Sequence, residues 1–291
     1  MNTRVFICFL FAILCLLGPA LGKSVLWEVR GNGQLAYVLG SVHMAKADLY
    51  PLAPAIDKAF HSAEELVLEA DLGAMFDAEN QSRLLAYGLL PDAKSLKSLV
   101  SEKTYAYLAA ESKKLGLNID LFNRFKPWFF GFTIYGLKLV KMGYKVELGV
   151  DYHFWGKARE KSMPVKELEG FMNQMKLLDS FSFAEQEQFL LYLLKDMEVL
   201  DAAIDLLFSA WKQGDIKRLE ELFMQVIREN PALKPLYAKL LYGRNRKMAD
   251  KITELMQHKK VLFIIVGAAH LVGKDSVIQE LQTRGYAVKQ L

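Results

Sequence analysis

Short apolar runs and helical periodicity alternate along the first part of the chain. Residues 25–30 and 34–39 flank Gly31-Asn32-Gly33, which predicts a β-hairpin because Asn-Gly accepts the positive φ values of a tight turn. Apolar residues then recur at helical spacing over residues 51–63, and residues 66–69 give another short strand. This part of the chain therefore predicts a hairpin, a helix and a strand that ends in an acidic residue.

The last part of the chain repeats part of this order, with a strand, a helix and a second strand. Residues 261–266 form an apolar run rich in β-branched side chains, which is typical of a buried strand. An amphipathic helix follows from about residue 275 to 284, and residues 286–291 predict a final strand. We interpret the two ends as related β-α-β units, which need right-handed crossovers, and we expect an α/β fold with a small mixed or parallel sheet.

The segment between these units, about residues 72–257, predicts a large helical cap with a short strand near residues 164–168. Ser182-Phe183-Ala184-Glu185 fits a capping box, which predicts the start of a long helix. Trp128 to Val140 is too short to span a bilayer and is interrupted by Lys138. It predicts a buried helix, with a helix on a membrane surface as the alternative.

The first 22 residues resemble a secretory signal peptide. One arginine precedes an apolar stretch from Val5 to Leu17, and small residues lie before Lys23. We expect cleavage near Lys23 and an exported protein, periplasmic or secreted. Leu14 precedes Cys15, whereas a lipoprotein signal needs a small residue there, so simple cleavage is favoured over lipid anchoring.

Composition narrows the function classes for the mature chain. Both cysteines lie in the predicted signal peptide, so residues 23–291 offer no disulfide and no thiolate nucleophile or ligand. With 52% hydrophobic residues, this length can bury the core of one domain, with residues 23–71 and 261–291 as the two halves of the sheet core. The net charge of +4 is spread along the chain, which argues against a nucleic-acid partner.

The same motif, G-x-x-H, closes two of the predicted strands. Gly40 to His43 follows the hairpin, and Gly267 to His270 follows the first strand of the tail. Ligands collect outside the carboxyl ends of strands in open α/β sheets, so the two imidazoles are expected to converge. With Glu69 they form a trio typical of Zn, Mn or Co sites in hydrolases. Each could instead be a structural residue, His43 and His270 as hydrogen-bonded imidazoles and Glu69 as a solvated side chain.

Two further polar residues, Glu169 and Arg244, are candidates for the site. Glu169 leaves the predicted strand near residues 164–168, so it is aimed at the same edge. Arg244 lies on a cap helix, where it either faces solvent or binds a carboxylate or oxyanion. Asp151 is explained most simply as a first-turn residue favoured by the helix dipole.

The chain resembles the TraB/GumN family, whose relatives include the animal TIKI metalloproteases. The strings that carry the resemblance are, in order, Leu26-Trp27-Glu28-Val29, Leu39-Gly40-Ser41-Val42-His43, Val67-Leu68-Glu69-Ala70-Asp71, Lys126-Pro127-Trp128, Glu147-Leu148-Gly149-Val150-Asp151, Leu168-Glu169, Arg244-Asn245-Arg246 and Val266-Gly267-Ala268-Ala269-His270.

This resemblance implies a divalent metal held by the two G-x-x-H motifs and glutamates, with manganese or cobalt serving peptide hydrolysis in the TIKI branch. It assigns His43, His270 and Glu69 as metal ligands and Glu69, Glu169 and Arg244 as catalytic or substrate-contacting residues. We expect a metal-dependent hydrolase acting on a peptide or another small substrate. Two alternatives stay open, a metal-independent esterase with His43 as general base and a non-catalytic binding or accessory protein in polysaccharide export.

Overall fold

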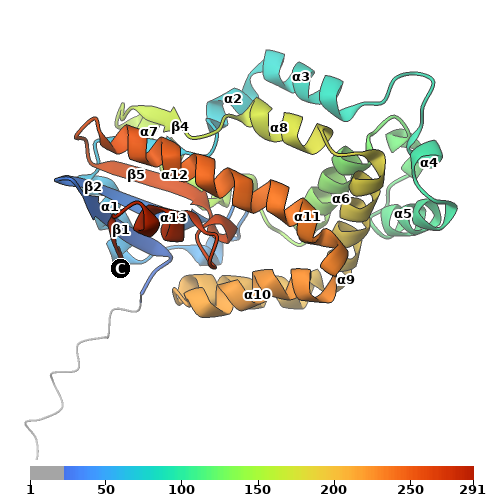
Figure 1. Cartoon of the computed structure of the whole chain (residues 1–291). Coiled ribbons are helices and arrows are strands. Elements are labelled where there is room, and N and C mark those ends of the chain that lie inside the picture. The colour runs from blue at the N-terminus through green and yellow to red at the C-terminus, as the bar shows by residue number, and fades with distance from the viewer. Residues whose placement is uncertain (1–22) are drawn as a thin grey trace, which may run out of the picture.

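One six-stranded mixed sheet lies at one end of this computed structural model, which describes residues 23–291, and most of the helices extend away from it (Figure 1). The predicted signal peptide, residues 1–22, lies outside the described residues. The strands are β1 (Leu26–Gly31), β2 (Gln34–Ser41), β3 (Glu65–Leu68), β4 (Val165–Glu167), β5 (Leu262–Gly267) and β6 (Ala287–Gln290). The predicted α/β class and mixed sheet are confirmed.

The order of strands across the sheet is β4-β3-β5-β2-β1-β6. The β1–β2 hairpin forms as predicted, with φ values of 53° at Asn32 and 74° at Gly33. β4, β3, β5 and β2 run parallel to one another, whereas β1 runs antiparallel to both β2 and β6. The two β-α-β units therefore interleave, because β5 of the tail lies between β2 and β3 of the first unit.

The helices that connect these strands cover both faces of the sheet. The connection from β2 to β3 runs through α1 (Pro54–Ser62), and the connection from β5 to β6 runs the other way through α13 (Val277–Thr283). Right-handed crossovers in opposite directions place the two helices on opposite faces. Ligands bind at such a reversal, outside the carboxyl ends of the two central strands, here β2 and β5.

The remaining helices form the cap, except for two that pack on the sheet. They are α2 (Leu72–Phe76), α3 (Ala78–Gly88), α4 (Leu96–Leu99), α5 (Glu102–Lys114), α6 (Pro127–Lys141), α7 (Val150–Glu160), α8 (Phe171–Asp179), α9 (Phe183–Lys212), α10 (Ile216–Glu229), α11 (Lys234–Tyr237) and α12 (Gly243–Met256). The two exceptions are α7, which packs beside α1 on one face of the sheet, and α12, which packs beside α13. A π-helical turn, Ala238–Tyr242, joins α11 to α12, and short 3-10 turns occupy Ala47–Leu49, Ile119–Phe122, Val146–Leu148, Pro231–Leu233 and Ala268–His270.

Two helices of the segment predicted as a cap pack on the sheet itself. Phe154 of α7 contacts Phe60 of α1 and Phe263 of β5, with ring centroids 4.9 and 5.0 Å apart. Ile252 of α12 belongs to the same buried core. This packing matters for function, because α7 and α12 both begin at the edge of the sheet where the G-x-x-H motifs end.

The long helix α9 joins the cap to the sheet. It starts at the predicted capping box of Ser182 and Glu185 and, with 30 residues, is about 45 Å long. Its amino-terminal half packs against α6 in the cap. Near its end the Trp211 indole donates to the Gly40 carbonyl at 2.8 Å, which ties the helix to the first G-x-x-H motif. None of the described helices combines the length and apolar character needed to cross a membrane.

We expect Phe263→Ala to lower the free energy of unfolding by about 3–5 kcal/mol, because it leaves a cavity where β5 meets α1 and α7. Chemical denaturation followed by tryptophan fluorescence measures the change. Leu121→Ala is the matched control, since the Leu121 side chain is 74% exposed and its loss should cost less than about 0.5 kcal/mol. Equal effects of the two substitutions would contradict this account of the core.

Candidate active site

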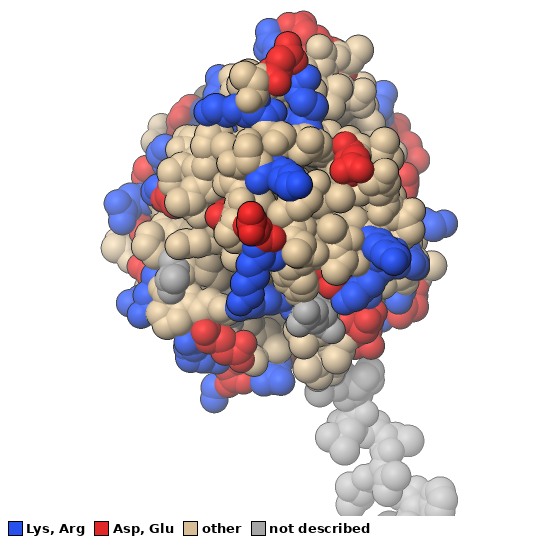
Figure 2. Space-filling view, turned by 90° about the vertical axis from the view of Figure 1, so that its right-hand side faces the viewer, with Lys and Arg blue, Asp and Glu red and all other residues tan. Residues whose placement is uncertain are grey.

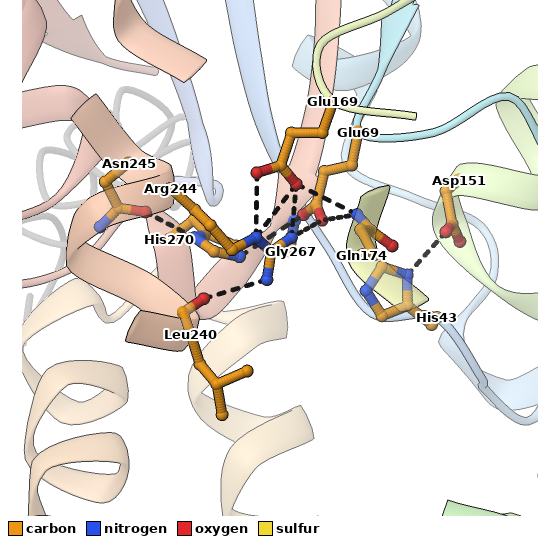
Figure 3. Close-up of polar contacts among 10 residues, drawn as sticks. All are labelled: His43, Glu69, Asp151, Glu169, Gln174, Leu240, Arg244, Asn245, Gly267 and His270. Carbon is orange, nitrogen blue, oxygen red and sulfur yellow. Dashed lines mark hydrogen bonds and ion pairs between the residues drawn. The ribbon is translucent and has the colours of Figure 1, made fainter. Parts of the chain in front are cut away.

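The two G-x-x-H motifs meet at the carboxyl edge of the sheet, as Figure 3 shows. In the parallel pairing of β2 with β5, Ser41 is the partner of Gly267. His43 follows two residues after Ser41, and a 3-10 turn over Ala268–His270 returns His270 to the same place. The expected convergence is therefore present in the backbone.

His43 is held by a carboxylate from α7. Its Nδ1 lies 2.7 Å from Asp151 Oδ2, and the imidazole is 63% exposed to solvent. Helix α7 reaches this position because Gly149 at its start packs directly on the His43 carbonyl, where a β-carbon would collide. The charge of Asp151 raises the pKa of His43 to about 9, so this ring is cationic at neutral pH.

His270 is held by an amide instead. Its Nδ1 lies 2.5 Å from Asn245 Oδ1, while Asn245 Nδ2 donates to the Asp275 carbonyl at 2.6 Å. That second bond fixes the orientation of the amide, so Nδ1 of His270 is the donor and Nε2 keeps a free lone pair. Burial lowers the pKa of His270 to about 4, so this ring is neutral at neutral pH.

Glu69 lies between the histidines and an arginine cluster. Its Oε1 accepts from the Gly267 amide and lies 3.9 Å from His270 Nε2. Its Oε2 accepts from Arg244 Nη2 at 3.0 Å and from Gln174 Nε2 at 3.2 Å. The carboxylate therefore turns one oxygen toward the histidines and the other toward the arginine.

Arg244 joins Glu69 to Glu169. Its Nε lies 3.0 Å from both Glu169 oxygens, and its Nη2 lies 2.6 Å from Glu169 Oε2. Nη1 donates to the Leu240 carbonyl in the π-helical turn at 3.0 Å. Both oxygens of Glu169 are thus bonded to one guanidinium.

The ionisation of Glu69 depends on these neighbours. Burial raises its pKa, but the nearby His270, His43 and Arg244 side chains and the Gly267 amide outweigh burial and lower the pKa well below its usual range. Because His270 is neutral at neutral pH, the cationic partners there are Arg244 and His43. Glu69 is an anion with its side chain only 11% exposed.

Gly267 marks the point where the three predicted metal ligands meet. A β-carbon built on it would lie 3.2 Å from Glu69 Oε1, 3.5 Å from His43 Nε2 and 3.7 Å from His270 Cδ2. Each histidine has its Nδ1 hydrogen-bonded to a side-chain oxygen, as metal-binding imidazoles commonly do, which fixes the ring and leaves Nε2 for the metal. Within residues 23–291, however, no three His, Cys, Asp or Glu side chains are grouped closely enough to hold a metal ion.

The structure brings all five predicted site residues, His43, Glu69, Glu169, Arg244 and His270, into one cluster. Three more residues belong to it that the sequence did not assign. Asp151 was interpreted only as a first-turn residue, and Asn245 appeared only as the neighbour of Arg244 in the sequence. No motif pointed to Gln174, which lies within the segment predicted as a helical cap. Chain positions alone could not show which partners these side chains meet.

Comparison with known proteins gives a consistent picture. The model of the TraB/PrgY/gumN family matches residues 25–290. A protein of Shigella flexneri named YbaP is 26% identical over 250 residues, which cover 85% of this chain and 88% of that protein.

Two more distant relatives carry the name metalloprotease. A TIKI homolog of Amphimedon queenslandica is 22% identical over 328 positions, covering 92% of this chain and 62% of that protein. Metalloprotease TIKI2 of Danio rerio is 22% identical over 317 positions, covering 92% and 61%. No solved structure matches the chain.

We expect Asp151→Asn to return the pKa of His43 from about 9 toward its ordinary value of 6.5, because the substitution removes the main charge that raises it. The raised pKa means that the His43–Asp151 pair stabilises the fold fully below about pH 6.5 and loses this effect as the pH rises through 9. An NMR titration of the His43 ring protons in metal-free protein measures the shift.

Asp57→Asn is the control for that titration. Asp57 pairs with Lys157, farther along the same helix α7, at 2.9 Å, and its loss should leave His43 unchanged. An unaltered His43 pKa in Asp151→Asn would show that the carboxylate does not govern this ring.

Proposed function

The chain belongs to the TraB/PrgY/gumN family, and from this premise we propose that it is an exported, metal-dependent hydrolase that cleaves amide bonds in peptides. The observation that carries the proposal is the meeting of two anchored imidazoles and Glu69 around Gly267. The distant relatives named metalloproteases support the same reaction class.

The donor chemistry at Gly267 suits a divalent metal. His43 Nε2, once it has lost its proton, His270 Nε2 and Glu69 Oε1 would hold it, and the three side chains would have to move closer together than they lie in this structure. Mn, Co and Zn all accept imidazole and carboxylate ligands. Such an ion would supply Lewis-acid polarisation of a carbonyl and would lower the pKa of a water molecule. Asp151 and Asn245 would then keep each ring oriented through Nδ1.

Arg244 and Glu169 act on Glu69 in this proposal. Arg244 Nη2 bridges the Oε2 atoms of both glutamates, which fixes Glu69 with Oε1 toward the histidines. Because both oxygens of Glu169 are occupied by Arg244, the geometry favours Glu169 as the residue that positions the arginine over a role as a free acid or base. Glu69 remains the candidate ligand or general base.

One observation favours a second, metal-independent candidate. An exposed imidazole with a carboxylate on Nδ1 is the arrangement of a general base. With its pKa raised to about 9, however, His43 is protonated at neutral pH and could accept a proton only in alkaline solution. This candidate predicts a rate of hydrolysis that rises with pH and does not change when a chelator is added.

We expect the purified protein to bind Mn, Co or Zn and to hydrolyse peptides, and we expect His43→Ala and His270→Ala to abolish both. Asn245→Ala should lower the metal affinity by about 10–100-fold, because it removes the partner that orients His270. Elemental analysis and peptide cleavage with and without chelator measure these effects. His61→Ala is the control, since His61 makes its hydrogen bond to the Asp57 carbonyl within α1 and takes no part in the cluster at Gly267.

The outcomes separate the alternatives. Chelator-resistant hydrolysis lost in His43→Ala but kept in His270→Ala would replace the metal proposal with the general-base candidate. A protein that binds no metal and cleaves neither peptide nor ester would point to a binding or accessory role.

Export is tested separately with the full chain. We expect the protein recovered outside the cytoplasm to begin near Lys23, and Ile13→Arg to keep the whole chain in the cytoplasm because a charge interrupts the apolar stretch. Cell fractionation with sequencing of the amino terminus measures this. Exported protein that retains Met1, or unchanged export of Ile13→Arg, would contradict a cleaved signal peptide.

A further inference from the structure

We propose that the side-chain carbonyl of Gln174 accepts a hydrogen bond from a backbone N–H of the bound peptide, which makes Gln174 a substrate-binding residue. It would discriminate an amide from an ester at one position of the substrate backbone. This inference rests on the proposed peptidase function and adds a residue that neither the motifs nor the relatives indicate.

The turn after β4 places Gln174 in the site. Gly170 has a φ of 90°, which favours glycine, and it reverses the chain so that α8 starts directly after Glu169. Asn173 Nδ2 donates to the Glu169 carbonyl at 2.7 Å and fastens the first turn of the helix. Gln174 therefore faces Glu169 through local structure, before any substrate binds.

The two glutamates fix the orientation of the Gln174 amide. Nε2 lies 3.2 Å from Glu69 Oε2 and 3.2 Å from Glu169 Oε2. Ionised carboxylates only accept hydrogen bonds, so the NH₂ group must face them and the carbonyl oxygen must point away. The acceptor is thus aimed by its own network, with both amide hydrogens occupied.

The carbonyl oxygen of Gln174 is free and accessible. Within residues 23–291 no group donates to Oε1, and this atom is not among the buried polar atoms that lack a partner. Figure 3 shows Gln174 extending between Glu69 and His43. Since the His43 ring is 63% exposed, the free acceptor lies on the open side of the cluster.

The charges around Gln174 select a neutral donor as its partner. Both cations of the cluster, Arg244 and His43, are paired with carboxylates, so neither is free for an anionic ligand group. A fixed carbonyl next to Glu69 suits an N–H, and a peptide offers one at each residue except proline. An ester at the same position presents only an acceptor, which would repel Oε1.

A ligand series with one atom changed tests this contact. The probes are the hexapeptide that the protein binds best from a random hexapeptide mixture and its analogues, in which an ester oxygen replaces one backbone N–H at a time. For the unaltered protein we expect one analogue to bind about three- to tenfold more weakly than the parent. Gln174→Met should abolish that difference, whereas Gln213→Met, a change at an exposed glutamine bonded to Ser209, should preserve it.

The affinities of the parent peptide and the ester analogue are compared on the same protein. A variant that weakens both ligands equally therefore leaves their ratio unchanged. If the difference persists in Gln174→Met, or if no hexapeptide binds, the Gln174 contact is refuted. Metal content and peptide cleavage are recorded in parallel. If the protein cleaves peptides but the affinity difference does not depend on Gln174, only this inference is refuted. If the difference depends on Gln174 in a protein that neither holds metal nor cleaves peptide, only the proposed function is refuted.

Discussion

The parallel pairing of β2 with β5 is the constraint on which the site depends. It joins the first part of the chain to the last, with Gly40 opposite Val266 and Ser41 opposite Gly267. Both strands end at the same edge, and their connections leave toward opposite faces of the sheet. A shift of one residue would turn every side chain of a strand to the other face. The register that buries the core thus also sets the distance between the two histidines.

The charge balance of the cluster follows from this geometry. Glu69 and Glu169 are each only 11% exposed, and two such carboxylates would repel each other without a cation between them. Arg244 supplies that cation, and its planar fork of donors reaches both. Its own position depends on the π-helical turn before α12, where the Leu240 carbonyl accepts from Nη1. An irregularity in one helix is therefore part of the support for an ionised Glu69.

Residues at strand ends were predictable from the sequence, and their partners from helices were not. Apolar runs and the repeated G-x-x-H located His43 and His270, because the end of a parallel strand fixes the edge at which the next residues emerge. Asp151 and Asn245 hold these rings from α7 and α12. Their contacts depend on how those helices pack on the sheet, which periodicity alone does not specify. The sequence could not predict the interleaving of the two β-α-β units for the same reason, because strand order is set by contacts between residues that are distant in sequence.

The two G-x-x-H motifs show how histidines at the same spacing after a strand-end glycine acquire different chemistry. Both histidines follow a glycine by three residues at the end of a parallel strand, yet at neutral pH one ring is cationic and the other neutral. The difference comes from the groups on Nδ1 and from burial. Asp151 provides a charge and leaves His43 open to solvent, whereas Asn245 provides only a dipole and His270 is sealed. The motif determines where each imidazole lies, and the helix that packs beside it determines its protonation. Two histidines with the same motif can thus differ in protonation. The ring that contacts an acid from its neighbouring helix is a proton donor, and the ring that contacts an amide keeps a free lone pair.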